Sequence, residues 1–106
     1  MVAASVLKEV TRRLVEQFSP ARIYLFGSQA RGSADDRSDV DLLVVCTVDG
    51  RKRDQMVAMD RALHGLAIAR DIVVLSPEEF EQSREIPGTV ARSAATEGRI
   101  LFDSAA

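Results

Sequence analysis

The stretch LFGSQARGSADDRSDVDLLVV, residues 25–45, contains the features that decide the fold. It joins two apolar runs through a polar loop that begins at Gly27 and Ser28, and the second run opens with Asp39 and Asp41. Residues two apart on a strand face the same side, with Cα atoms about 6.6 Å apart. The sequence therefore predicts two neighbouring carboxylates at the entrance to a buried strand, where their like charges need a compensating group.

Magnesium would compensate these carboxylates, because Mg²⁺ binds a few carboxylates together with phosphate oxygens and water. Carboxylates at this separation can lean over two metal ions about 3.5 to 4 Å apart, the spacing of two-metal phosphoryl-transfer sites. Asp71 heads another apolar run, IVVL, and would supply a second-metal ligand or the general base for an attacking hydroxyl. In the alternative interpretation, Asp39 is a cap or turn residue and Asp41 an exposed strand end. We predict a metal site formed by Asp39, Asp41 and Asp71.

Gly27 and Ser28 lie where a strand turns into a short helical start. Glycine lets the backbone approach a ligand closely, while backbone N–H groups and the serine hydroxyl can hold phosphate oxygens. Arg31 would add a charge-assisted contact to phosphate, or would instead pair with Asp35 or Asp36. The loop lacks the glycine patterns of the P-loop and of dinucleotide folds. Together with the downstream acids, it is predicted to form half of a nucleotide site.

Helical and strand patterns alternate along the chain. Apolar residues at helical spacing predict an amphipathic helix that ends at Ser19-Pro20. We then expect strands at 22–26, 39–48, 70–76 and 99–102, and helices from 51 to about 64, from the cap Ser76 onward and at 89–97. The link between the first two strands is too short for a full helix, which favours antiparallel pairing. The predicted fold class is α/β (α+β), a small mixed β-sheet with helices packed against it.

Length and composition fit one compact domain spanning residues 1–106, with 46% hydrophobic and 28% charged residues. A net charge of -2 gives no general attraction for nucleic acid. Cys46 is the single cysteine and is predicted to be buried, and the single histidine, His64, excludes a histidine metal cluster. No apolar run approaches the roughly 20 residues needed to cross a bilayer, so a cytoplasmic protein is expected. The basic run at 51–53 is a solvated helix start, or it steers triphosphate or docks an acidic partner.

The segments GSQARG, SDVDLLVV and RDIVVL together resemble the signature of the DNA polymerase beta-like nucleotidyltransferases, specifically the minimal nucleotidyltransferase (MNT) domain proteins. The resemblance covers nearly the whole chain and implies the polymerase-beta-like nucleotidyltransferase fold. It implies that Gly27 and Ser28 bind phosphate, that Asp39 and Asp41 bind metal, and that Asp71 is the third catalytic carboxylate. Such domains use magnesium to transfer a nucleoside monophosphate from a nucleoside triphosphate to a hydroxyl, releasing pyrophosphate.

The resemblance also implies a partner. Minimal members are commonly encoded beside a HEPN-domain protein, and as antitoxins they adenylylate a tyrosine of the HEPN toxin or bind it. The function implied is transfer of AMP from ATP, with two Mg²⁺ ions, to a hydroxyl of such a partner. Two alternatives stay open. One is a non-catalytic antitoxin or nucleotide-sensing binding module that neutralises a HEPN partner by occlusion, and the other is a transferase for a small molecule such as an aminoglycoside. A chain this short leaves little material for an acceptor domain, so we expect the acceptor on another protein or a second copy.

Overall fold

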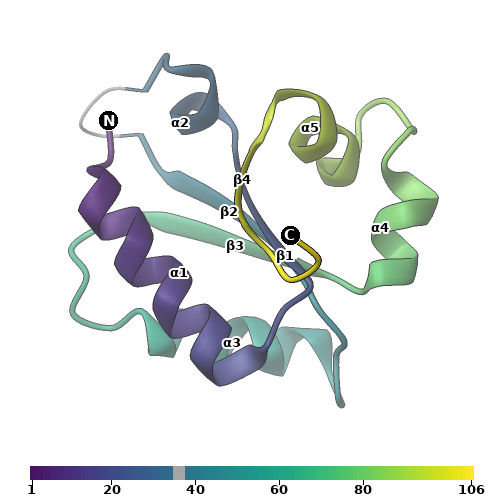
Figure 1. Cartoon of the computed structure of the whole chain (residues 1–106), viewed down its shortest axis with the longest axis horizontal. Helices are drawn as coiled ribbons and strands as arrows, with labels where there is room; N and C mark the ends of the chain where they lie inside the picture. Colours follow the sequence, from purple (N-terminus) through teal and green to yellow (C-terminus); the bar gives the residue numbers. More distant parts are fainter. Residues whose placement is uncertain (35–37) are drawn as a thin grey trace.

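The computed structural model describes residues 1–34 and 38–106 (Figure 1). The elements in chain order are α1 (Ala4–Phe18), β1 (Arg22–Phe26), α2 (Ser28–Arg31), β2 (Val40–Val45), α3 (Lys52–Ala62), β3 (Arg70–Leu75), α4 (Pro77–Ser83), α5 (Val90–Glu97) and β4 (Arg99–Asp103). The predicted alternation of helices and strands is confirmed.

The four strands form one mixed sheet in the order β3-β2-β1-β4. β1 pairs antiparallel with both β2 and β4, whereas β2 and β3 are parallel. The predicted mixed sheet and the antiparallel pairing of the first two strands are therefore correct. The register of β2 with its neighbours places Asp41 opposite Phe26 on one side and opposite Asp71 on the other.

Helices cover both faces of the sheet, with α1 and α3 on one face and α4 and α5 on the other (Figure 1). Leu42 and Val44 of β2 belong to the core beneath α1 and α3, while Leu43 and Val45 belong to the core beneath α4 and α5. This alternation follows from the two-residue period of a strand. β2 is thus buried on both faces, as its continuous apolar run predicts.

Local backbone and side-chain caps define several helix ends. α1 ends at Ser19, whose φ is 46° and whose N–H donates to the Val15 carbonyl. α4 begins with the predicted capping box, in which Glu79 N–H donates to Ser76 Oγ at 3.1 Å and Ser76 N–H donates to Glu79 Oε1 at 2.9 Å. Lys52 Nζ donates to the same carboxylate at 2.7 Å, and this contact is the main cause of the lowered pKa of Glu79.

The expected end of α3 near His64 and Gly65 is wrong by two residues, because the helix ends at Ala62. The N–H groups of Leu63 and His64 turn to carbonyls only three residues back, at 3.1 Å in both cases. Arg13 of α1 donates to the carbonyls of Ala62 and His64, at 3.2 and 2.9 Å. A distant guanidinium therefore satisfies carbonyls at the helix end.

Two expectations from the sequence concern the burial of Cys46 and membrane-spanning helices. Cys46 is buried, as predicted, and burial raises the pKa of its thiol. In the described part of the chain, no helix is both long and apolar enough to span a bilayer.

Replacing Ser76 with alanine removes the side-chain acceptor of the capping box. We expect Ser76→Ala to lower the free energy of unfolding by about 1 kcal/mol, the usual cost of losing a serine cap. Urea unfolding measures the change. Ser93→Ala, in the exposed face of α5, is the matched control and should leave stability almost unchanged. Equal free energies of unfolding for the Ser76 variant and the wild type would show that the Ser76 cap does not stabilise the protein.

Candidate active site

The end of the sheet where β1 ends and where β2 and β3 begin carries the three predicted aspartates. Asp41 and Asp71 are the second residues of their strands, and the parallel register sets them directly opposite each other. Register partners project to the same face of a sheet, here the face that bears Leu43 and Val45. Asp39 lies two positions before Asp41, in the segment that leads into β2. The structure thus brings the three predicted positions to one end of the sheet.

The electrostatic environment of Asp41 reflects this arrangement. Asp41 is half-buried, whereas Asp39 and Asp71 are exposed. Burial raises the pKa of the Asp41 carboxyl, the negative charges of Asp71 and Asp39 raise it further, and the Arg31 guanidinium opposes them. A cation at this position would relieve both the burial and the repulsion.

These carboxylates suit Mg²⁺ chemically, because they are oxygen donors at an open end of the sheet. Across residues 1–34 and 38–106, however, no three His, Cys, Asp or Glu side chains are gathered closely enough to hold a metal ion. The aspartates are neighbours that interact electrostatically, without a closed ligand set. Their role as metal ligands stays a prediction.

Gly27 brings the turn after β1 against the Asp41 side chain. Its backbone has φ 73° and ψ -155°, a combination that is essentially restricted to glycine. A Cβ at this position would overlap Asp41 Oδ2 and would lie 3.2 Å from Asp41 Cγ. Gly27 therefore closely approaches a carboxylate in this structure, and its predicted contact with phosphate stays a prediction.

Ser28 and Arg31 are the first and last residues of the short helix α2. Ser28 is half-buried directly after Gly27, which places its hydroxyl and the turn at the same end of the sheet as the aspartates. Arg31 Nη1 lies 3.6 Å from Glu97 Oε2, so the described ion-pair partner of Arg31 belongs to α5. The partners considered in the sequence, Asp35 and Asp36, lie outside the described residues. Arg31 joins α2 to the end of α5 while its charge acts on Asp41.

Gln29 is a buried site residue that sequence reasoning missed. Its side chain is 6% exposed, and it is the single buried polar residue in the described part of the chain. Gln29 Oε1 accepts a hydrogen bond from Val2 N–H at 2.9 Å, and Gln29 Nε2 donates to the Ser38 carbonyl at 3.2 Å. Glutamine in a polar loop is usually exposed, so the residue type gave no signal of this role.

The basic run at residues 51–53 only partly matches its expected role as a solvated helix start. Lys52 pairs with Glu79, whereas Arg51 and Arg53 are exposed. Arg53 also lines a hollow of about 380 Å³ that borders Asp71. Steering of triphosphate by this run therefore remains a prediction.

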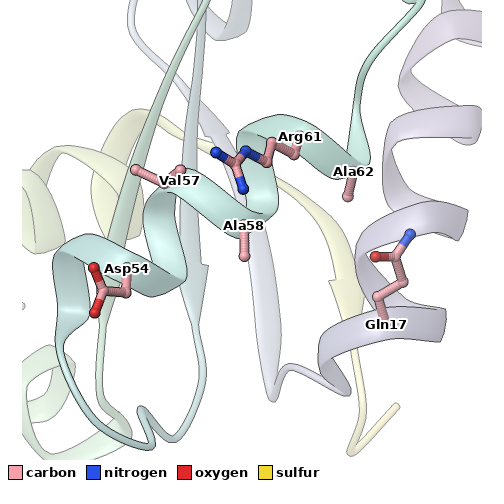
Figure 2. A pocket seen from close by; sticks show the side chains of 6 residues that line it. All are labelled: Gln17, Asp54, Val57, Ala58, Arg61 and Ala62. Atoms are coloured by element: carbon pink, nitrogen blue, oxygen red, sulfur yellow. The ribbon is translucent and has the colours of Figure 1, made fainter.

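A second hollow, of about 600 Å³, lies between α1 and the outer side of α3 (Figure 2). Its lining residues are Gln17, Asp54, Val57, Ala58, Arg61 and Ala62. None of them is a predicted site residue, and Figure 2 shows the Asp54 and Arg61 side chains well separated on α3. The predicted site residues lie instead at the aspartate end of the sheet.

Comparison with known proteins places the chain in a family. The model of the nucleotidyltransferase domain family matches residues 7–101. A Methanocaldococcus jannaschii protein named as protein adenylyltransferase MJ0604 is 33% identical over 81 residues, which are 76% of this chain and 77% of that protein. The chain therefore belongs to the nucleotidyltransferase domain family. It is accordingly a nucleotidyltransferase.

Solved structures share the fold. A Sulfolobus solfataricus protein described as a nucleotidyltransferase has a TM-score of 0.67 at 23% identity, covering 95% of this chain and 80% of that one. A toxin-antitoxin complex with AMP-PNP has a TM-score of 0.62 at 22% identity, covering 92% and 73%. A variant of the toxin-antitoxin MntA-HepT has a TM-score of 0.61 at 20% identity, with the same coverage of 92% and 73%. The predicted nucleotidyltransferase fold is confirmed.

Removing the charge of Asp41 should stabilise the metal-free protein. Because the pKa of Asp41 is raised by folding, the ionised carboxylate destabilises the fold at neutral pH. This penalty is absent below the unfolded pKa, grows as pH rises from the unfolded toward the folded pKa, and is fully present above the folded pKa. Asp41→Asn should therefore unfold at a higher temperature than the wild type at neutral pH in metal-free buffer, and the difference should shrink in acid.

Calorimetry at several pH values measures this effect. Asp49→Asn, which removes an exposed carboxylate from a loop, is the control for net charge. If Asp41→Asn were no more stable than Asp49→Asn at neutral pH, the like-charge environment of Asp41 would be refuted.

A side chain at Gly27 should disturb the site. Gly32→Ala is the control, because Gly32 also has positive φ, at 74°, but a Cβ there would meet only Met1 Cε at 3.9 Å. We expect Gly32→Ala to cost about 1–2 kcal/mol and Gly27→Ala to cost more. Shortening the opposing side chain in a Gly27→Ala/Asp41→Ala variant should recover part of the loss in urea unfolding. No recovery would show that the overlap with Asp41 is unimportant.

Proposed function

We propose that this nucleotidyltransferase is magnesium-dependent and transfers AMP from ATP to a hydroxyl group of a partner protein, with a HEPN-domain toxin as the partner. The observation that carries the proposal is the register that sets Asp41 opposite Asp71, with the Gly27 turn packed against the Asp41 carboxylate. This arrangement combines acidic groups with a turn suited to phosphate at one end of the sheet.

Each residue has a specific task in this reaction. Asp39, Asp41 and Asp71 would hold Mg²⁺, which when bound lowers the pKa of the attacking hydroxyl and offsets charge on the phosphates. Ser28 would orient the triphosphate, and Arg31, half-exposed near Glu97, would contact phosphate oxygens. The acceptor oxygen forms a bond to the α-phosphorus as the bond to pyrophosphate breaks. The acceptor proton passes to Asp71, whose carboxylate is exposed.

The relatives support the choice of nucleotide and acceptor. One relative is named as a protein adenylyltransferase. A structural neighbour is a toxin-antitoxin complex with AMP-PNP, an analogue of ATP. In the MntA-HepT variant, two aspartates two positions apart are replaced by glutamate, and Asp39 and Asp41 have the same spacing here. These facts favour AMP as the transferred group and a toxin as the acceptor.

Intact-mass analysis of the adjacent-gene protein tests the proposal. The two proteins are incubated with Mg²⁺ and, separately, with ATP, GTP, CTP or UTP. We expect a mass gain of one or more adenylyl groups with ATP. Asp41→Asn should slow this transfer by on the order of 10²-fold or more, the effect of losing one electrostatic stabiliser of a transition state. Asp49→Asn should retain the wild-type rate, and gain with another nucleotide alone would overturn the assignment of AMP.

A second candidate is a non-catalytic antitoxin that neutralises its partner by occlusion. The observation favouring it is that the described acidic residues are not assembled into a metal-ligand set. A stable complex with no mass gain, together with neutralisation retained by Asp41→Asn, would establish this candidate. Loss of neutralisation in Asp41→Asn, together with loss of the mass gain, would exclude it.

A further inference from the structure

We propose that Gln29 is a positioning residue that holds Asp39 in place for metal and nucleotide binding. The inference rests on the proposed function and assigns a role to the buried glutamine within the loop sequence GSQARG. The described hydrogen bonds of Gln29 go to Val2 and Ser38 and not to an aspartate side chain. Gln29 would therefore act on Asp39 through the backbone that leads to it.

The two ends of the Gln29 carboxamide hold two distant parts of the chain. Its oxygen accepts from Val2 N–H, 27 residues away, and its nitrogen donates to the Ser38 carbonyl, nine residues away. Because the oxygen is engaged by Val2, the nitrogen is directed toward Ser38. A buried amide that lost either partner would leave a polar group unsatisfied, which is costly. The side chain is therefore held in one orientation.

The Ser38 contact fixes one side of Asp39, and a strand hydrogen bond fixes the other. Ser38 immediately precedes Asp39, and Val40 N–H immediately after it donates to the Ala69 carbonyl at 2.8 Å. Asp39 itself is exposed and lies outside β2. Its backbone is thus anchored on both sides, by Gln29 and by the residue that precedes β3. Without the Gln29 anchor, the first carboxylate would lose its defined position relative to Asp41.

Substitutions can separate positioning from general stability. Gln29→Glu keeps the size of the side chain and the acceptor for Val2, but its ionised carboxylate cannot donate to Ser38. The added negative charge would by itself strengthen the binding of Mn²⁺ in the absence of nucleotide, so weaker binding of Mn²⁺ alone cannot be an effect of charge. Val2→Pro removes the N–H at the other end and leaves the Ser38 bond possible. Gln17→Glu, at the far end of α1 (Figure 2), is the control for the same change of charge.

The affinity of the protein for Mn²⁺ alone, measured by electron paramagnetic resonance of the free ion, is the first readout, because AMP-PNP in solution would itself bind the ion. We expect Gln29→Glu to weaken Mn²⁺ binding by about 10- to 100-fold, the range for residues that orient metal ligands. Val2→Pro should weaken it by less, and Gln17→Glu should not change it. In an Asp39→Asn background, Gln29→Glu should cause no additional loss, because the residue it positions is already altered.

Amide hydrogen exchange without metal is the second readout. Gln29→Glu should speed exchange at residues 39 and 40 while leaving the interior of α1 unchanged. A purely structural role predicts a lower unfolding temperature with wild-type Mn²⁺ affinity, and this result would overturn the inference. If Gln29→Glu does not fold, unchanged Mn²⁺ affinity in Val2→Pro would overturn it as well. If the wild type itself bound no Mn²⁺, the proposed function would fail first, and the inference with it.

Discussion

The register of the parallel β2–β3 pair is the constraint on which the rest of the site depends. It sets two carboxylates, Asp41 and Asp71, opposite each other, and like charges in that position disfavour the pairing. The same register aligns Leu42 with Ile72 and Val44 with Val74, all of which are buried. Apolar burial along the strands therefore holds in place an acidic end that would not form by itself.

The division of the sheet between a buried middle and an acidic end explains how a small fold can carry a reaction. Helices close both faces over the apolar residues, while the turn at Gly27 and the start of β2 remain at the end of the sheet (Figure 1). Burial and the neighbouring negative charges both raise the pKa of the Asp41 carboxyl, and a bound cation would relieve both effects.

Local patterns predicted much of this fold, and long-range contacts account for what they missed. The cap at Ser76 and the turn at Gly27 each depend on a few adjacent residues, so their chemistry could be recognised in the sequence. The end of α3 depends on Arg13, some fifty positions earlier, and the role of Gln29 depends on Val2. The sequence also placed Asp71 at the head of a strand, but only pairing of β2 with β3 could show which residue lies opposite it.

The position of β3 at one edge of the sheet makes the two facing carboxylates unequal. Asp41 lies on an interior strand, with β1 on one flank and β3 on the other, and the Gly27 turn closes over it. Asp71 has a strand neighbour on one flank only, and its side chain is exposed. The acidic end of the sheet is therefore asymmetric, because Asp41 is enclosed by two strands and the Gly27 turn whereas Asp71 is open to solvent on its outer flank.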